Sequence, residues 1–158
     1  MKKKIYLAGG WFSPEQEEEH TRIYNLIKDE YDVFNPKLAS LVKPDSTQDE
    51  MTQTFLGNLE AIRNADIVLV ITDRKDIGTI WEAGYAYANQ KPIVYYAETL
   101  GNKPFNLMLA KTGRVVINEI QLLFELADED NYKFTAVHDY DGVIEWLSDK
   151  KNICLEHH

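Results

Sequence analysis

Short apolar runs and longer segments with helical spacing alternate along the chain. The run Ile67-Val68-Leu69-Val70-Ile71 is unbroken, which is typical of a parallel strand covered on both faces. Shorter runs of β-type residues lie next to glycine, proline or asparagine. Together these patterns predict five strands, at residues 4–8, 31–34, 66–71, 93–96 and 115–117.

Between these runs, apolar residues recur at intervals of three and four, which indicates amphipathic helices. The first predicted helix, residues 14–29, begins with Ser13-Pro14-Glu15-Gln16, which supplies an N-cap, a proline at the first helical position and a glutamine at the third. Residues 36–49 lack periodicity and predict a long loop, a candidate lid over a binding site. The other predicted helices cover residues 50–64, 83–90, 105–111, 119–127 and 142–148.

The alternation of strands and helices predicts an α/β fold of flavodoxin-like or Rossmann-like type, with one mainly parallel five-stranded sheet and helices on both faces. A chain of 158 residues suits a single domain of this kind. We expect that domain to span residues 1–154, because Leu155-Glu156-His157-His158 resembles the start of an affinity tag.

Composition narrows the range of partners. The formal net charge is −9 and the only basic cluster is Lys2-Lys3-Lys4, so nucleic acid would be repelled and a small molecule is the expected ligand. No apolar run is long enough to cross a bilayer and no signal peptide is found, so we expect a cytoplasmic protein without a membrane partner. The four histidines and the single cysteine show no metal-ligand spacing, and we predict neither a metal nor a cofactor.

Two carboxylates surround a glycine turn directly after the most apolar run. Asp76, Gly78 and Glu82 lie at the carboxyl end of the third predicted strand, the usual ligand side of an open α/β sheet. Glu82 has two interpretations: it closes a capping box with Thr79, or it is a carboxylate that the dipole of the first helical turn keeps ionised. Asp76 is either a turn aspartate or a second carboxylate that shares acid–base work with Glu82.

A second glycine turn follows the first strand. The residues Gly9-Gly10-Trp11-Phe12 do not form a dinucleotide fingerprint, yet they lead to a helix N-terminus where backbone N–H groups can meet a ligand. Trp11 and Phe12 are either core residues or aromatics that stack on a base. Tyr6 is either a half-buried strand residue or points into the same crevice.

Taken together and in this order, four segments resemble the nucleoside 2-deoxyribosyltransferase family. The element Asp76-x-Gly78-x-x-x-Glu82 and the later Asn106-Leu107-Met108 are the more specific matches. The resemblance implies a transferase of nucleotide salvage that exchanges the base of a 2′-deoxyribonucleoside for a free nucleobase, through a covalent 2-deoxyribosyl–glutamate intermediate. The segments are residues 4–13, 58–66, 76–86 and 103–108.

The resemblance also implies a role for individual residues. Glu82 would be the nucleophile, Tyr6 would orient it, and Asp76 would engage the leaving base. Asn106 would reach the 5′-hydroxyl of a substrate bound to a neighbouring subunit, which implies a homo-oligomer with shared active sites. The full substrate-binding set predicted here is Gly9, Trp11, Phe12, Asn58, Gly78 and Asn106.

One position departs from the family pattern, and two other functions stay open. Asn58 stands where many members carry an acidic residue, and an amide cannot donate a catalytic proton in the same way. The first alternative is a 2′-deoxynucleoside 5′-monophosphate N-glycosidase, a hydrolase that would use the same Glu82. The second is a nucleotide-binding module without turnover. The sequence leaves the base preference and the number of subunits open.

Overall fold

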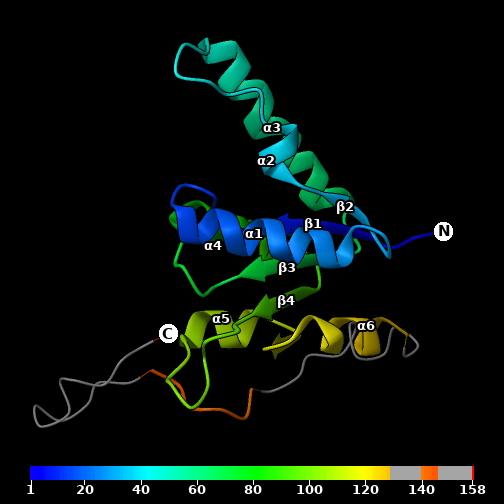
Figure 1. Cartoon of the computed structure of the whole chain (residues 1–158), viewed down its shortest axis with the longest axis vertical. Coiled ribbons are helices and arrows are strands. Elements are labelled where there is room, and N and C mark those ends of the chain that lie inside the picture. The colour runs from blue at the N-terminus through cyan, green and yellow to red at the C-terminus, as the bar shows by residue number, and fades with distance from the viewer. Residues whose placement is uncertain (129–139, 146–157) are drawn as a thin grey trace, which may run out of the picture.

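The computed structural model describes residues 1–128, 140–145 and 158. Its centre is a five-stranded sheet in which every pair of neighbouring strands is parallel and the strand order is β2-β1-β3-β4-β5 (Figure 1). This order is flavodoxin-like and confirms the predicted α/β fold. The strands are β1 (Lys4–Ala8), β2 (Asp32–Phe34), β3 (Ile67–Ile71), β4 (Ile93–Tyr96) and β5 (Val115–Ile117).

Helices cover both faces of the sheet, so successive residues of a strand are buried in two different cores. Ile5 and Leu7 of β1 pack in the core beneath α1 (Pro14–Ile27) and α6 (Ile120–Asp128). Tyr6 and Ala8 face the opposite core, which lies beneath α4 (Ile77–Ala88) and α5 (Leu107–Thr112). Both faces are apolar because a parallel sheet covered by helices on two sides leaves neither face to water.

Three predicted elements differ in the structure. The predicted loop 36–49 contains a short helix, α2 (Pro36–Ala39), which the Asn35 side chain caps. Helix α4 begins at Ile77 instead of residue 83, because Asp76 caps it. Residues 142–145 are not helical, and Ile144 forms a β-bridge with Phe105; the rest of that predicted helix, residues 146–148, lies outside the described residues.

Helix α3 (Gln48–Asn64) projects away from the sheet together with α2, and we call residues 36–64 the α2–α3 arm (Figure 1). Ile62 is the only buried residue of α3. Phe55 and Leu56 are 48% and 54% exposed. Near the middle of α3, Phe55 packs on Trp81 of α4, with ring centroids 5.9 Å apart. The arm therefore carries apolar side chains that its own chain leaves uncovered.

Within the described ranges, no helix combines the length and the apolar character that a membrane span needs.

Candidate functional site

The candidate site lies where the strand order reverses, between the carboxyl ends of β1 and β3, which is the usual ligand position in this architecture. Two loops leave the sheet there: the glycine loop (residues 9–12) after β1, and the β3–α4 loop (residues 72–76) after β3. The loops touch each other at Gly10. A Cβ atom on Gly10 would lie only 2.9 Å from the Cβ of Asp76, so glycine is required for this approach.

Glu82 and Tyr6 form the centre of the site. The hydroxyl of Tyr6 donates a hydrogen bond to Oε2 of Glu82. Tyr6 is completely buried, and its ring stacks on Phe34 of β2 at a centroid distance of 5.5 Å. Because the ring is held by the sheet on one side and by Phe34 on the other, the hydroxyl presents a fixed donor to the carboxylate.

Burial dominates the protonation of Glu82. It raises the pKa of Glu82 to about 7, the hydrogen bond from Tyr6 acts in the opposite direction, and the charge of Asp76 adds a smaller increase. Burial, together with the charge of Glu82, also raises the pKa of Tyr6 well above its usual range, so Tyr6 remains a donor. At neutral pH about half of the Glu82 side chains are therefore ionised.

The predicted electrostatics of Glu82 were wrong in one respect. The helix dipole was expected to keep this carboxylate ionised in the first turn, but α4 begins at Ile77 and Glu82 lies in its second turn. The dipole acts mainly within the first turn. Desolvation by the surrounding core therefore raises the pKa of Glu82, and the hydrogen bond from the Tyr6 hydroxyl limits this increase.

Asp76 is the N-cap of α4, which corrects the predicted capping box between Thr79 and Glu82. Its Oδ2 accepts hydrogen bonds of 2.8 Å from both the backbone N–H and the hydroxyl of Thr79. Thr79 is itself buried and occupies the third helical position. This cap starts the helix earlier than predicted, frees Glu82 to face Tyr6, and makes Oδ1 of Asp76 the oxygen that can meet a ligand.

The predicted residues of the glycine loop lie beside Asp76 in different environments. Gly9 is buried, and a Cβ there would lie 2.8 Å from Cδ1 at the end of the Ile71 side chain, which would have to shift to make room. Trp11 is half-buried and its ring lies 4.9 Å from that of Phe12. Phe12 is 74% exposed at the mouth of the loop, where an aromatic face is available for a ligand.

Gly78 lies on α4, the helix that carries Glu82, and Asn58 lies on α3. A Cβ on Gly78 would make only an ordinary contact, at 3.4 Å from Oδ2 of Asp76. Asn58 is half-buried on α3, and within the described part of the chain its side chain makes no hydrogen bond. Its amide therefore remains available to a ligand.

Asn106 lies on the other side of α4. Its Oδ1 caps α5 by accepting hydrogen bonds from Met108 and Leu109, and its Nδ2 donates to Glu145. It lines an open cleft of about 440 Å³ together with Ile80 of α4. Ile80 and Glu82 are two residues apart, roughly 200° around a helix. Asn106 and Glu82 of one chain consequently face different sides of α4.

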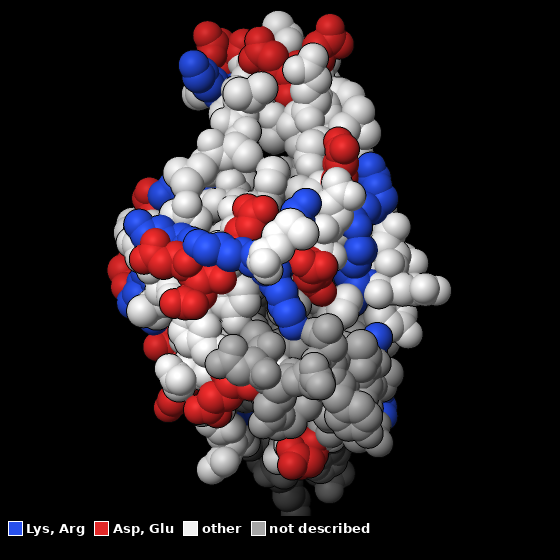
Figure 2. All heavy atoms as spheres, turned by 90° about the vertical axis from the view of Figure 1, so that its right-hand side faces the viewer, with Lys and Arg blue, Asp and Glu red and all other residues white. Residues whose placement is uncertain are grey.

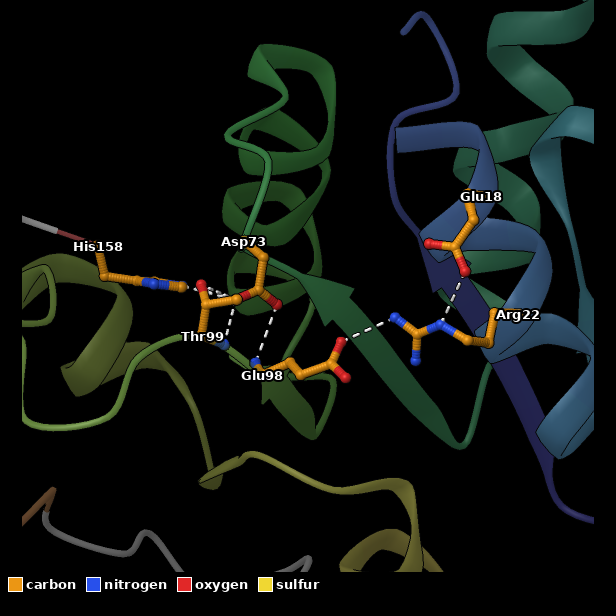
Figure 3. A network of polar contacts seen from close by, with 6 residues as sticks. All are labelled: Glu18, Arg22, Asp73, Glu98, Thr99 and His158. Atoms are coloured by element: carbon orange, nitrogen blue, oxygen red, sulfur yellow. Dashed lines mark hydrogen bonds and ion pairs between the residues drawn. The ribbon is translucent and has the colours of Figure 1, made fainter. Parts of the chain in front are cut away.

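Asp73 was not predicted, although its side chain is fully buried in the β3–α4 loop. It accepts hydrogen bonds from the backbone N–H groups of Glu98 and Thr99 and from the Thr99 hydroxyl, at 2.7–2.9 Å. Arg22 of α1 extends this network through its ion pair with Glu98 at 2.8 Å (Figure 3). A lone aspartate after an apolar strand carries no pattern that separates such a buried anchor from an exposed turn residue.

Two further residues near the site, Thr79 and His158, were not predicted as site residues. Thr79 is the partner of the Asp76 cap, and the spacing Asp76-x-x-Thr79 could have indicated it. His158 lies 2.7 Å from Thr72, and Figure 3 shows it beside Asp73. We assign His158 no role, because it belongs to the predicted tag remnant.

The charged surface is mixed. Figure 2 shows acidic and basic side chains interspersed over one face of the molecule, with acidic groups at the end of the α2–α3 arm. Among residues 1–128, 140–145 and 158, His, Cys, Asp and Glu side chains do not gather in groups of three or more that could hold a metal ion.

Comparison with known proteins gives concordant results for sequence and fold. The family profile described as nucleoside 2-deoxyribosyltransferase matches residues 5–122. The nucleoside deoxyribosyltransferase of Lactobacillus leichmannii is 30% identical over an alignment of 138 residues, which covers 77% of this chain and 87% of that protein.

Solved structures show the same architecture. The 2-deoxyribosyltransferase of Bacillus psychrosaccharolyticus superposes with a TM-score of 0.68 at 23% identity, over 87% of this chain and 98% of that one. A CMP N-glycosidase of Clostridium botulinum superposes with a TM-score of 0.50 at 23% identity, over 80% of this chain and 98% of that one. At such identities these two likenesses establish a shared fold.

Proposed function

The chain belongs to the nucleoside 2-deoxyribosyltransferase family, and on that premise we propose that it exchanges the base of a 2′-deoxyribonucleoside through a covalent intermediate on Glu82. The observation that carries the mechanism is the hydrogen-bonded pair of half-buried Glu82 and buried Tyr6 beside Asp76. A desolvated carboxylate that a donated hydrogen bond keeps partly ionised is a competent nucleophile.

The reaction has two displacements at C1′ of the sugar. First, an oxygen of Glu82 bonds to C1′ while the bond from C1′ to the base nitrogen breaks, and the base leaves with a proton from Asp76 or water. Then a nitrogen of the incoming base bonds to C1′, the ester bond to Glu82 breaks, and the proton of that nitrogen passes to Asp76 or water. Two inversions retain the β-configuration, as in retaining glycosidases.

Base exchange is tested directly by chromatography. The protein is incubated with thymidine or deoxyadenosine and a different free base, and the exchanged nucleoside is the expected product. Glu82→Gln removes the nucleophile and should abolish exchange. Glu19→Gln is the matched control, because Glu19 is a buried carboxylate on α1 whose pKa burial also raises to about 7, and it should retain exchange.

The covalent step is tested without an acceptor base. Wild-type protein mixed with nucleoside alone should gain the mass of one 2-deoxyribosyl group, and Glu82→Gln should not. Failure of the wild type to exchange any base, or full exchange by Glu82→Gln, would refute the proposal.

We also propose that the active site is shared between two copies of the chain, with Asn106 of one copy meeting the substrate held by Glu82 of the other. Two observations support this assembly. Asn106 lines a cleft on the Ile80 side of α4, roughly 200° around the helix from Glu82, which supports a site that draws these two residues from different copies. The exposed Phe55 and Leu56 of the α2–α3 arm also offer apolar surface for a second copy to cover.

Mixing two inactive variants tests the shared site. Glu82→Gln and Asn106→Ala are each expected to lack exchange when expressed alone. In a two-fold assembly formed by co-expression, half of the assemblies are mixed and each contains one intact site, so about a quarter of wild-type activity should return. No return of activity in mixed assemblies, verified by mass spectrometry, would contradict the shared site.

One observation favours a second candidate, a hydrolase acting on 2′-deoxynucleoside 5′-monophosphates. Lys75 lines the same cleft as Asn106, where a cation can meet a 5′-phosphate. A parallel incubation with deoxynucleotides separates the two functions: release of 2-deoxyribose 5-phosphate without any exchanged product would favour the hydrolase. Tight binding of a donor without turnover would favour the non-catalytic nucleotide-binding module.

A further inference from the structure

Gln16 joins the two loops that border the candidate site. Its Oε1 accepts a hydrogen bond of 2.9 Å from the backbone N–H of Phe12 in the glycine loop. Its Nε2 donates a hydrogen bond of 3.2 Å to the carbonyl oxygen of Arg74 in the β3–α4 loop. The backbone N–H of Gln16 is held by Ser13, the N-cap of α1, so the side chain starts from a fixed point. One side chain thus spans the carboxyl ends of β1 and β3.

The spacing between these loops leaves little freedom. A Cβ on Gly10 would lie 2.8 Å from Oε1 of Gln16 and 2.9 Å from the Cβ of Asp76. Gly10 is therefore enclosed between Gln16 and Asp76. A change at Gln16 should be transmitted to Asp76 through both the Arg74 carbonyl and the Gly10 contact.

The β3–α4 loop is fastened a second time at Asp73, the residue before Arg74. Asp73 accepts hydrogen bonds from the backbone of Glu98 and Thr99 and from the Thr99 hydroxyl (Figure 3). Lys75 follows both fastened residues, directly before Asp76, and adopts a left-handed conformation with φ 45°. Gln16 holds this loop toward β1, and Asp73 holds it toward β4.

We infer that Gln16 is a positioning residue for base transfer, which sets Asp76 against the glycine loop at the spacing that a nucleobase requires. This inference rests on the proposed function. Asp76 and the aromatic Phe12 are the groups proposed to meet the base, and Gln16 is hydrogen-bonded to the backbone of one loop and to that of the other. Gln16 itself need not touch the substrate.

The inference makes a specific prediction about the second displacement. The 2-deoxyribosyl group on Glu82 leaves either to a base, which gives an exchanged nucleoside, or to water, which gives free 2-deoxyribose. A base must be oriented by the two loops, whereas water needs no such orientation. Loosening the loops should therefore slow transfer to a base more than transfer to water.

The test measures the ratio of free 2-deoxyribose to exchanged nucleoside at a fixed base concentration. This ratio does not depend on the fraction of protein that is folded, so simple destabilisation leaves it unchanged. Gln16→Leu should raise the ratio by roughly tenfold, since it removes both hydrogen bonds. Gln16→Glu keeps an acceptor for Phe12 but loses the donor to Arg74, and it should also raise the ratio.

Variants of Thr99, whose backbone and hydroxyl hold Asp73, test the second fastening of the loop independently. Thr99→Val removes the hydroxyl that donates to Asp73 and should raise the ratio. Thr99→Ser keeps the hydroxyl and should have the wild-type ratio. Glu98→Gln is the matched control: it weakens the ion pair with Arg22 but keeps the backbone N–H that Asp73 accepts, so the ratio should equal that of the wild type.

The outcomes separate the inference from the proposed function. If the wild type exchanges bases and the Gln16 variants keep its ratio within about twofold, Gln16 is only structural and the inference is overturned. If Glu98→Gln raises the ratio as much as Gln16→Leu does, the effect is not specific to the loop fastenings and the inference also fails. If the wild type exchanges no base, the proposed function fails and the inference fails with it.

Discussion

Replacing Tyr6 by phenylalanine should shift the acidic limb of the pH–rate profile to higher pH. The change removes the hydroxyl that donates to Glu82 and leaves the ring stacked on Phe34. A hydrogen bond to a charged group contributes about 1.5–3 kcal/mol, which corresponds to roughly 1–2 pKa units. The wild-type pKa of about 7 for Glu82 should therefore rise, because desolvation then acts unopposed by Tyr6.

The size of the effect depends on pH in a way that loss of protein would not. At pH 7 the ionised fraction of Glu82 should fall from about one half to between one tenth and one hundredth, so exchange should fall by roughly 5- to 50-fold. At pH 9 most of this loss should disappear, because the carboxylate ionises again. Any loss that persists at pH 9 measures the orienting role of the hydroxyl.

The assay is the initial rate of base exchange between pH 5 and 9.5, with kcat/KM for the nucleoside plotted against pH. Tyr95→Phe is the matched control, since Tyr95 is equally buried in the same core but lies on β4, two strands from Tyr6 in the sheet, and its hydroxyl is hydrogen-bonded to Thr112 at 2.6 Å. An acidic limb that stays at the wild-type pH in Tyr6→Phe, or that moves to lower pH, would refute the electrostatic argument.

Three further predictions concern stability. The pKa of Glu82 is raised from 4.5 to about 7 on folding, so the wild type loses stability as pH rises through that interval. In urea unfolding, the free energy of unfolding of Glu82→Gln should therefore exceed that of the wild type by up to about 3 kcal/mol at pH 8 and should equal it at pH 4. Glu19→Gln should show a gain of the same sign, because burial raises its pKa to about 7 as well; equal stability of either variant and the wild type at both pH values would contradict this. Gly10→Ala should cost about 1–3 kcal/mol and weaken exchange by displacing Asp76, and a crystal structure with Asp76 unmoved would refute the second part. Thr79→Val should lower the free energy of unfolding by about 1 kcal/mol, and with it the melting temperature, because one hydrogen bond to Asp76 is lost. Thr79→Ser keeps the hydroxyl and should leave the melting temperature unchanged.

The sheet could be predicted from the sequence because its signal is local. Each strand is a short apolar run next to a turn residue, and the parallel arrangement follows from the helices between strands. Helix α2 was missed although Asn35-Pro36 repeats the cap-and-proline pattern of Ser13-Pro14. The four-residue length of α2 leaves no room for helical periodicity, so the cap was its only signal.

The candidate site was less predictable because its interactions join distant parts of the chain. Two caps compete at the start of α4, one through Asp76 and Thr79 and the other through Thr79 and Glu82. The choice depends on Tyr6, which is 76 residues from Glu82 and draws its carboxylate away from the helix end. The raised pKa of Glu82 is likewise set by the surrounding core, whereas the dipole rule considers only the helix itself.

The projecting arm links local folding to assembly. Helix α3 has 17 residues, not far above the length below which an isolated helix is marginal in water, and Ile62 is its only buried residue. In a lone chain the amides of its first turns should exchange with deuterium rapidly, and a second copy covering Phe55 and Leu56 should protect them. Amide exchange along α3, measured against protein concentration, would thus report association without any substrate. The measured association constant would also include the free energy of ordering this helix.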